Sequence, residues 1–203
     1  MQQQSFRISC SFALVHAAPI LHGRDVTGFA PGSKLQCRNM TDTTHIRWDL
    51  RPGDLGRIAA LHGEVYATEP GFPGDLTFEA YVCRTLSDFM LENRGAGRIW
   101  LAEKGGRLVG CTAMVDRGGR GQLRWVLVAP QARGTGLGRD LVGRAMDYAY
   151  EQGWRQVFLE TTTGLPASMA IYEKLGFKVV SETPLEHWNA GDHTQLTMVK
   201  ALS

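Results

Sequence analysis

A glycine-rich turn joins an apolar strand to an amphipathic helix in the second half of this sequence. The apolar run of residues 126–128 ends at Ala129-Pro130, and a helical pattern begins directly after the turn. The turn itself contains Gln131, Arg133, Gly134, Gly136 and Gly138. The first N–H groups of a helix favour an anion, and glycines let that anion approach the backbone. The sequence therefore predicts a site for a phosphate-bearing ligand.

Two common phosphate-binding loops do not fit this turn. A P-loop closes its glycine run with Lys and then Ser or Thr, whereas here Gly138 precedes Arg139-Asp140. The dinucleotide fingerprint needs the spacing G-x-G-x-x-G, whereas the glycines here are spaced by two throughout. The pattern Gln131-x-x-Gly134-x-Gly136 instead resembles the acetyl-CoA pyrophosphate loop of the GCN5-related N-acetyltransferase (GNAT) family.

A second segment carries the same resemblance. Residues 170–177, with the sequence AIYEKLGF, end a predicted helix in the pattern Tyr-x-x-x-Gly-Phe, which looks like the other motif of this family. The segment lies one strand and one loop after the glycine turn, as it does in the family. Because two separate motifs match in the right order, the chain is identified as similar to GNAT acetyltransferases over residues 46–202.

The resemblance implies where acetyl-CoA binds. In the family, the pantetheine arm lies between two splayed strands and pairs with the backbone of the first, which here is Val126, Leu127 and Val128. The pyrophosphate is then expected on the N–H groups of Arg133, Gly134, Thr135, Gly136, Leu137 and Gly138. Arg133 and Arg139 would add positive charge, with Gln131 beside them and Ser168 lining the channel. The alternative is a tight strand-to-helix turn without a ligand, with Thr135 as a helix cap and Ser168 bonded to the backbone of its own helix.

The resemblance places Tyr172 as the general acid that protonates the departing CoA thiolate. The alternative is an aromatic core residue. Many family members also have a Glu on the strand before the glycine turn, but residues 122–125 hold no carboxylate. The proton of the amine must then be accepted elsewhere, and Glu160 is the expected base. Glu64, His62 and His187 are further candidates.

The sequence departs from the family pattern at one position near the cofactor. The Asn that the family often has seven residues before the Tyr is Leu165 here, so one cofactor contact is absent. Trp125 could serve a flat or apolar substrate, as could Trp100 and Trp188, although core packing also explains such residues. Residues 123–125 and 154–163 also resemble the acetyltransferase half of MarR–GNAT fusion proteins.

Hydrophobic periodicity predicts an α/β fold with a mixed central sheet and helices on both faces. The resemblance to the GNAT family implies that this sheet is mostly antiparallel and that its strands splay at the acetyl-CoA site. The glycine pair at 105–106 predicts a hairpin. The expected strands are residues 45–50, 98–103, 107–116, 122–128, 155–162, 177–182 and 194–200, and the expected helices are 54–68, 77–93, 137–152 and 166–175.

Composition limits the remaining possibilities. A chain of 203 residues allows one domain with an appendage. We interpret residues 1–44 as a disordered extension or a start codon assigned too early, and residues 45–203 as the GNAT domain. A mitochondrial transit segment is the alternative for the first residues, which hold no acid up to Arg24.

The net charge of +2 argues against a nucleic-acid surface, and no apolar run approaches the ~20 residues that span a bilayer. The four cysteines, Cys10, Cys37, Cys83 and Cys111, have no ligand-like spacing. They indicate unpaired thiols in a reducing compartment. We therefore expect a cytoplasmic protein without metal, nucleic-acid or membrane partners, as a monomer or a homodimer.

Three functions compete at this stage. The first is an acetyl-CoA-dependent N-acetyltransferase that transfers the acetyl group directly to a primary amine of a small molecule or peptide. The second is a non-catalytic acyl-CoA sensor, because a fold and a cofactor site do not prove chemistry. The third, a DNA-binding regulator, is disfavoured by the charge. The acceptor loops are expected at residues 68–76 and 183–193, and the sequence does not identify the acceptor.

Overall fold

The computed structural model describes residues 43–72, 74–185 and 193–202. All of them belong to the compact unit Asn39–Ser203. The prediction for residues 1–44 falls outside the described residues, apart from residues 43 and 44. Among the residues that are described, no helix is both long enough and apolar enough to cross a membrane.

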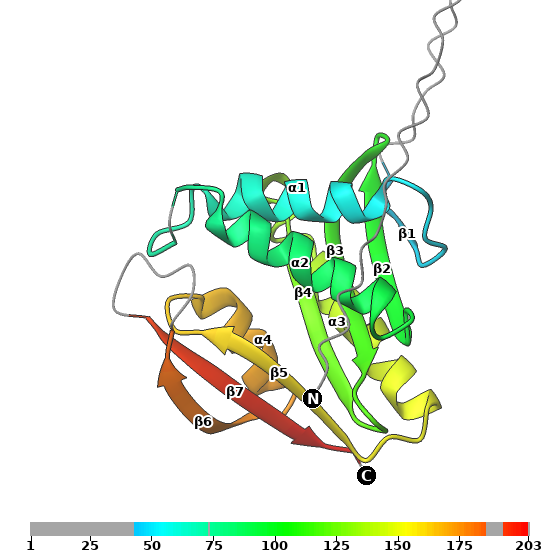
Figure 1. Cartoon of the computed structure of the whole chain (residues 1–203), viewed down its shortest axis with the longest axis vertical. Helices are drawn as coiled ribbons and strands as arrows, with labels where there is room; N and C mark the ends of the chain where they lie inside the picture. The colour runs from blue at the N-terminus through cyan, green and yellow to red at the C-terminus, as the bar shows by residue number, and fades with distance from the viewer. Residues whose placement is uncertain (1–42, 73, 186–192, 203) are drawn as a thin grey trace, which may run out of the picture. The chain divides into compact units, whose positions relative to one another are not determined.

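The described elements follow the predicted order of strands and helices. Figure 1 labels the strands and α-helices, which are β1 (His45–Arg47), α1 (Asp54–Tyr66), α2 (Thr77–Leu91), β2 (Gly97–Lys104), β3 (Arg107–Asp116), β4 (Gly121–Val128), α3 (Leu137–Glu151), β5 (Gln156–Thr162), α4 (Pro166–Lys174), β6 (Lys178–Pro184) and β7 (Thr194–Ala201). A short 3-10 turn, η1 (Pro130–Ala132), lies between β4 and α3.

Some boundaries differ from the prediction by a few residues. The first strand was expected to reach residue 50, but β1 ends at Arg47. The side chain of Arg47 donates hydrogen bonds to the Asp49 carbonyl and to both carboxylate oxygens of Asp54, which turns the chain into α1. The first two helices each end two residues earlier than expected, at Tyr66 and Leu91.

The strands form a single seven-stranded sheet in the order β1-β2-β3-β4-β5-β7-β6. Among the described strand pairs, only β4–β5 is parallel, because α3 carries the chain from the end of β4 back to the start of β5. The other described pairs are antiparallel. The β2–β3 hairpin turns at Gly105 and Gly106, both with positive φ, which a two-residue type I′ turn requires. The predicted mixed, mostly antiparallel sheet is confirmed.

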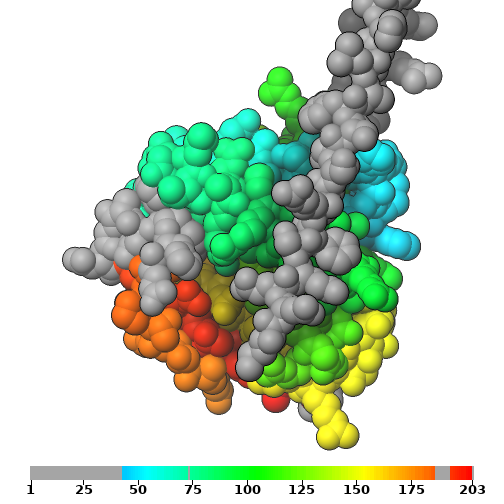
Figure 2. Space-filling view, viewed as in Figure 1, coloured from blue at the N-terminus to red at the C-terminus, as the bar shows by residue number. Residues whose placement is uncertain are grey.

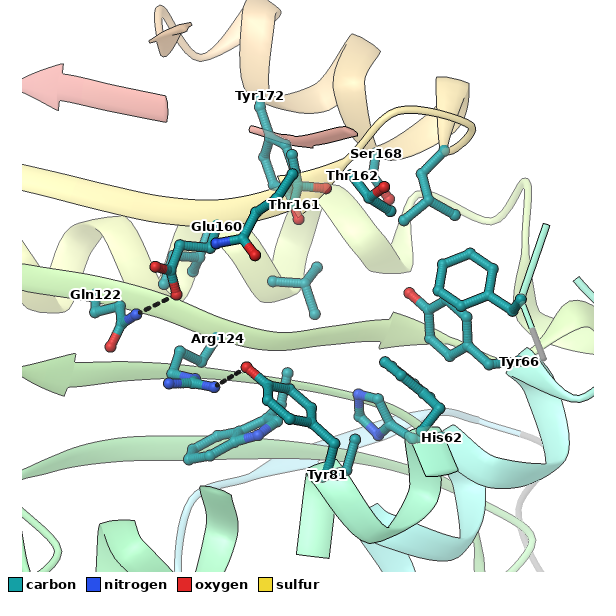
Figure 3. A pocket seen from close by; sticks show the side chains of 18 residues that line it. His62, Tyr66, Tyr81, Gln122, Arg124, Glu160, Thr161, Thr162, Ser168 and Tyr172 are labelled. Atoms are coloured by element: carbon teal, nitrogen blue, oxygen red, sulfur yellow. Dashed lines mark hydrogen bonds between the residues drawn. The ribbon is translucent and has the colours of Figure 1, made fainter. Parts of the chain in front are cut away.

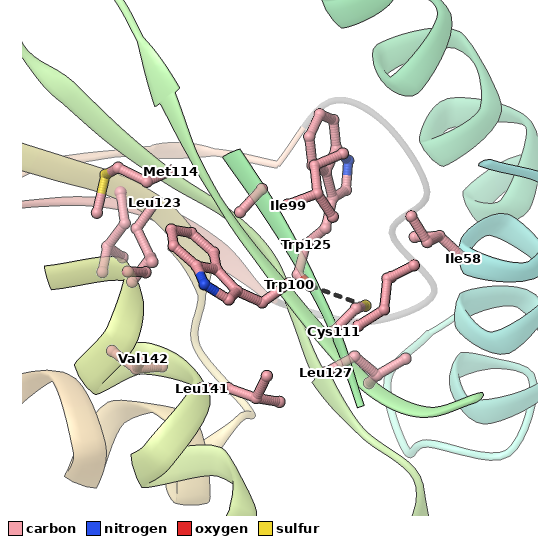
Figure 4. Packing of buried hydrophobic residues seen from close by; sticks show 14 of the residues in the cluster. Ile58, Ile99, Trp100, Cys111, Met114, Leu123, Trp125, Leu127, Leu141 and Val142 are labelled. Atoms are coloured by element: carbon pink, nitrogen blue, oxygen red, sulfur yellow. Dashed lines mark hydrogen bonds between the residues drawn. The ribbon is translucent and has the colours of Figure 1, made fainter. Parts of the chain in front are cut away.

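Helices cover both faces of the sheet, as predicted. Strand β3 is buried on both faces over seven consecutive residues. Figure 4 shows Met114, Leu123 and Val142 on the side of α3, while Ile58 of α1 packs on the opposite side. Strand β6 differs because all seven of its residues are exposed, and Figure 2 shows it in orange at the surface.

The parallel strands β4 and β5 pair over only three positions and then separate. Their register runs from Gly121–Val157 to Leu123–Leu159 and stops there. Beyond that point the remainder of each strand keeps its other neighbour, β3 for β4 and β7 for β5. The predicted splay is therefore present, and it leaves the facing edges of β4 and β5 without strand partners.

A β-bulge in β4 lies where the splay begins. The β3–β4 register skips one residue between the pairs Cys111–Leu127 and Ala113–Arg124. Trp125 has a φ of 48°, an uncommon value for a residue with a bulky side chain. A bulge directs neighbouring side chains to the same face. Here Arg124 and Trp125 both contact α2, through Tyr81 and Thr85 respectively.

Candidate active site

The glycine turn after β4 presents open backbone donors at the start of α3. Gly134 has a φ of 77° and Gly136 a φ of 86°, both in the left-handed region that favours glycine. A Cβ on either residue would meet no atom within 4 Å, so the space around them is empty. No side chain caps the first N–H groups of α3. These groups are therefore available to an anion.

The side chains of the turn are only partly directed at this space. Arg133 forms an ion pair with Glu69, from the loop after α1, and its Nε donates to the Val128 carbonyl at 3.3 Å. The Thr135 hydroxyl donates to the Ala132 carbonyl at 2.8 Å, which stabilises the turn. Gln131 is exposed. Neither Gln131 nor Thr135 lines the cavity that opens in front of the turn, so a cofactor role for their side chains stays a prediction.

A cavity of about 470 Å³ opens in front of the turn, and we call it the turn cavity. Most of the residues that were predicted to bind acetyl-CoA line this cavity, and so does Leu165. The predicted residues in its wall are Val126, Leu127, Val128, Arg133, Gly134, Gly136, Leu137, Gly138, Arg139 and Ser168.

A second cavity, of about 130 Å³, lies beside the splay between β4 and β5, and we call it the splay cavity. Figure 3 shows it between α1 and α2 on one side and β5 with α4 on the other. Four residues line both cavities: Tyr66, Val126, Leu165 and Ser168. The two cavities therefore adjoin and form one cleft from the glycine turn to the splay.

Tyr172 lines the splay cavity from α4. The residue is 5% exposed, and its ring packs edge-on against Phe177. Burial raises the pKa of its phenol well above the usual value, Tyr66 raises it further, and Ser168 acts in the opposite direction. The phenol consequently keeps its proton at neutral pH. Tyr172 is thus both a packed aromatic residue and a cavity residue, so the two sequence interpretations are compatible.

Glu160 and Thr162 of β5 add polar groups to the wall of the splay cavity. The Glu160 carboxylate is exposed and accepts a hydrogen bond from Gln122 Nε2 at 3.3 Å. Gln122 in turn accepts a hydrogen bond from Arg117 at 2.8 Å. Thr162 is 1% exposed, and its hydroxyl has no hydrogen-bond partner among the residues that the structure describes. Because buried polar groups are nearly always bonded, this hydroxyl is suited to a ligand in the cavity.

The other candidate bases differ in position. His62 lines the splay cavity and is 3% exposed, with Nδ1 2.8 Å from the Ile58 carbonyl. Burial lowers the pKa of His62 to about 4, opposed only in part by that hydrogen bond, so the ring is neutral at pH 7. Glu64 is exposed and is not part of the cavity wall. His187 lies outside the described residues.

An aromatic wall lies on α1, α2 and the loop between them, and of its residues only Phe72 falls in a predicted part of the site, the acceptor loop at residues 68–76. It consists of Tyr66, Phe72, Phe78 and Tyr81, all of which line the splay cavity together with His62. The Tyr66 ring centroid lies 4.5 Å from that of Phe72 and 4.4 Å from that of Phe78. Burial raises the pKa of Tyr66 to about 12, and the nearby Glu69 carboxylate adds to the effect. In the sequence, Tyr66, Phe78 and Tyr81 look like ordinary core residues of their helices.

The three tryptophans of interest have different surroundings. Trp125 lines the splay cavity, and its indole donates to the Thr85 hydroxyl at 3.2 Å while packing edge-on against Phe89. Trp100 is a core residue, 4% exposed and packed against Tyr148. Trp188 lies outside the described residues. Of the cysteines, Cys83 and Cys111 are unpaired, and Cys10 and Cys37 are not described.

Comparison with known proteins gives a family. The sequence model of the acetyltransferase (GNAT) family matches residues 63–177. N-acetyltransferase 8F1 of Rattus norvegicus is 35% identical over 88 residues, 40% of either chain. IAA acetyltransferase of Azospirillum brasilense is 37% identical over 82 residues, 39% of this chain and 54% of the relative. The chain thus spans about half the length of the curated relatives it matches.

Solved structures share the fold. The acetyltransferase yncA of Salmonella typhimurium, a structure with its cofactor acetyl-CoA, superposes with a TM-score of 0.61 at 20% identity. The superposition covers 79% of this chain and 95% of the other. This similarity confirms the predicted architecture.

Proposed function

Because the chain belongs to the acetyltransferase (GNAT) family, we propose that it transfers the acetyl group of acetyl-CoA to a primary amine of a small molecule or peptide. The observation that carries this proposal is the cleft formed by the two adjoining cavities. The cleft joins open N–H donors at the start of α3 to the buried phenol of Tyr172. The anion site at one end suits the phosphates of acetyl-CoA, and the proton donor at the other end suits the departing thiolate.

The turn cavity fits the phosphate end of acetyl-CoA. The N–H groups from Gly134 to Gly138 would bind the pyrophosphate, and Arg139 would add charge. Ala129 N donates to Val109 on β3, so strand alternation directs the backbone groups of Val126 and Val128 into the splay. Those groups would pair with the pantetheine arm, and the partnerless Thr162 hydroxyl is a further donor.

Bound acetyl-CoA supplies a thioester, whose C–S bond breaks as the acceptor nitrogen forms a C–N bond with the acetyl carbon. Tyr172 donates the proton that converts the departing sulfur to a thiol. The raised pKa of its phenol keeps that proton in place up to alkaline pH. The proposed transfer is direct and has no covalent acyl-enzyme. Cys111, the buried thiol, is hydrogen-bonded to the Trp125 carbonyl and lines neither cavity, so it is not placed to accept the acetyl group.

The acceptor nitrogen must lose a proton before or during attack. Glu160 is the group that we propose to accept it, directly or through water, because its carboxylate lines the splay cavity and reaches solvent. His62 is the alternative, but its low pKa makes the ring a weak base. Comparing Glu160→Gln with His62→Gln in the same assay distinguishes the two roles.

The test of the proposed function measures release of free CoA from acetyl-CoA with a panel of primary amines. We expect Tyr172→Phe to lower kcat by about 10²- to 10⁴-fold, because it removes the proton donor but keeps the ring. The KM for acetyl-CoA should stay unchanged. Tyr150→Phe, an exposed tyrosine on α3, is the matched control.

If no amine supports CoA release while calorimetry still detects acetyl-CoA binding, the acyl-CoA sensor is the correct interpretation. The absence of a carboxylate among residues 122–125 is the feature that favours that alternative. A wild-type rate in Tyr172→Phe would remove the assigned acid but leave acetyl transfer intact. The cytoplasmic location, the oligomeric state and the division at residue 45 stay predictions.

A further inference from the structure

Two side chains of opposite charge lie on neighbouring strands where the sheet opens. Leu123 and Leu159 form the last register pair of β4 and β5, so Arg124 and Glu160 are the next residue on each strand. Both line the splay cavity, on the opposite face from the two buried leucines. Figure 3 shows them on neighbouring strands at the same end of the cavity.

Arg124 has no carboxylate partner among the described residues. Its guanidinium lies 5.3 Å from the centroid of the Trp125 ring and donates one hydrogen bond, to the Tyr81 hydroxyl at 3.4 Å. Within the described part of the chain, Glu160 accepts a hydrogen bond from Gln122 alone, and no ion pair joins it to Arg124. The guanidinium is thus held by an aromatic ring and a phenol while most of its donors remain open. An arginine held in this way suits a carboxylate, which it can bind with two parallel hydrogen bonds.

The remainder of the cavity is suited to an apolar group. The aromatic wall of Tyr66, Phe72, Phe78 and Tyr81 forms one side, and Val82 and Leu165 add aliphatic surface. Phe72 is 7% exposed and Phe78 is 8% exposed, so this wall is held rigidly by its own packing. Pockets of this kind bind apolar rings, and a few polar groups fix the orientation.

We propose that the acceptor is an α-amino acid with an aromatic or other large apolar side chain. Its carboxylate would bind Arg124, its ammonium would lie toward Glu160, and its side chain would contact the aromatic wall. This inference rests on the proposed acetyl transfer, because it names the acceptor of the same cleft. Neither a polyamine, which lacks a carboxylate, nor the N-terminus of a peptide, where the carboxylate has become an amide, matches both charges.

The first experiment measures binding by the full chain with saturating CoA, so that it does not depend on turnover. Calorimetry compares L-phenylalanine with phenethylamine, which lacks the carboxylate, with L-phenylalaninamide, which mimics a peptide N-terminus, and with L-alanine, which lacks the ring. We expect phenylalanine to bind roughly 10- to 100-fold more tightly than phenethylamine or the amide, because a bond to a charged group is lost. Alanine should also bind more weakly than phenylalanine.

The second experiment measures CoA release with the same compounds for wild type and Arg124→Gln. The variant should raise the KM for phenylalanine by about tenfold or more and leave the KM for phenethylamine and acetyl-CoA unchanged. Arg124→Lys keeps the charge and should restore part of the preference. Arg144→Gln, which removes an exposed arginine of α3, is the matched control. A folded state of each variant is verified by its thermal melting.

The outcomes separate the two proposals. If phenethylamine or phenylalaninamide binds as tightly as phenylalanine, the amino-acid assignment is wrong, and equal turnover with all amines would still support acetyl transfer. If phenylalanine binds in an Arg124-dependent way but no compound releases CoA, the acceptor site stands and the proposed enzyme activity fails. Failure of all four compounds to bind overturns the acceptor assignment.

Discussion

His62 makes the stability of this protein depend on pH through a buried, neutral imidazole. The ring is 3% exposed, and its Nδ1 lies 2.8 Å from the Ile58 carbonyl, one turn earlier in α1. Because that carbonyl can only accept, Nδ1 carries the proton of the neutral ring. Burial lowers the pKa of His62 from 6.5 to about 4, and the bond to Ile58 opposes the change only in part.

The direction of the effect follows from the protons bound in each state. Between about pH 4 and pH 6.5 the unfolded chain binds a proton at His62, and the folded chain does not. The free energy of unfolding therefore rises with pH in this interval. The part of it that depends on the neutral His62 is lost as the pH falls from 6.5 toward 4. Each unit of difference between the folded and the unfolded pKa of His62 corresponds to about 1.4 kcal/mol. The full difference, from 6.5 to about 4, therefore corresponds to roughly 3 kcal/mol.

The assay is urea unfolding followed by tryptophan fluorescence at several pH values between 4 and 7.5, for wild type and His62→Gln. The stability difference between the two proteins should change by roughly 3 kcal/mol over this range, to the disadvantage of wild type at low pH. The pKa values of Asp54 and Glu103 are also lowered, but these carboxylates titrate in both proteins and cancel. His45→Gln, at an exposed histidine, is the control.

Parallel stability curves for wild type and His62→Gln would refute this reasoning. They would mean that His62 takes up its proton at the same pH in the folded and unfolded chain. An NMR titration gives an independent check, because a folded-state pKa of His62 near 6.5 contradicts the burial argument directly.

Two further predictions concern the glycine turn and the first helix. Gly136→Ala places a Cβ at a φ of 86°, so we expect about 1–2 kcal/mol of strain. It should also raise the KM for acetyl-CoA, measured by CoA release. Gly143→Ala, within α3, is the control and should leave that KM unchanged. Arg47→Met leaves the 3%-exposed Asp54 carboxylate without its main partner, so urea unfolding should report a loss of about 3 kcal/mol. Arg51→Met, which breaks an exposed pair, should lower the stability much less than Arg47→Met, and an equal loss would contradict the burial argument.

The elements of the fold were predicted well because their signals are local. Glycines at 105–106 and 134–138 lie at the turns that they predicted, and hydrophobic periodicity identified each helix. Errors were confined to ends, such as β1, where the side chain of Arg47 bonds to residues beyond the strand. The bulge at Trp125 had no comparable signal, since the sequence there reads as an ordinary apolar strand.

The candidate site also has one part that the sequence predicts and one part that it does not. The turn cavity is lined mainly by one continuous segment, so its residues could be named from two motifs. The splay cavity combines α1 and α2 with β4, β5 and α4, and its aromatic residues have the spacing of a helix core. Their place beside Tyr172 depends on packing between segments about a hundred residues apart, which no local pattern encodes.

The order of the elements, the glycine turn after β4 and the place of Tyr172 on the last helix follow from the sequence, because each depends on residues that are neighbours in the chain. What lies opposite that tyrosine depends on how distant segments pack. The register of β4 and β5 stops at Leu123 and Leu159, which brings Arg124 and Glu160 to the mouth of the splay and exposes them to the aromatic wall. Strand register and helix packing are long-range properties, so the proposed acceptor could be inferred only once the chain was seen folded.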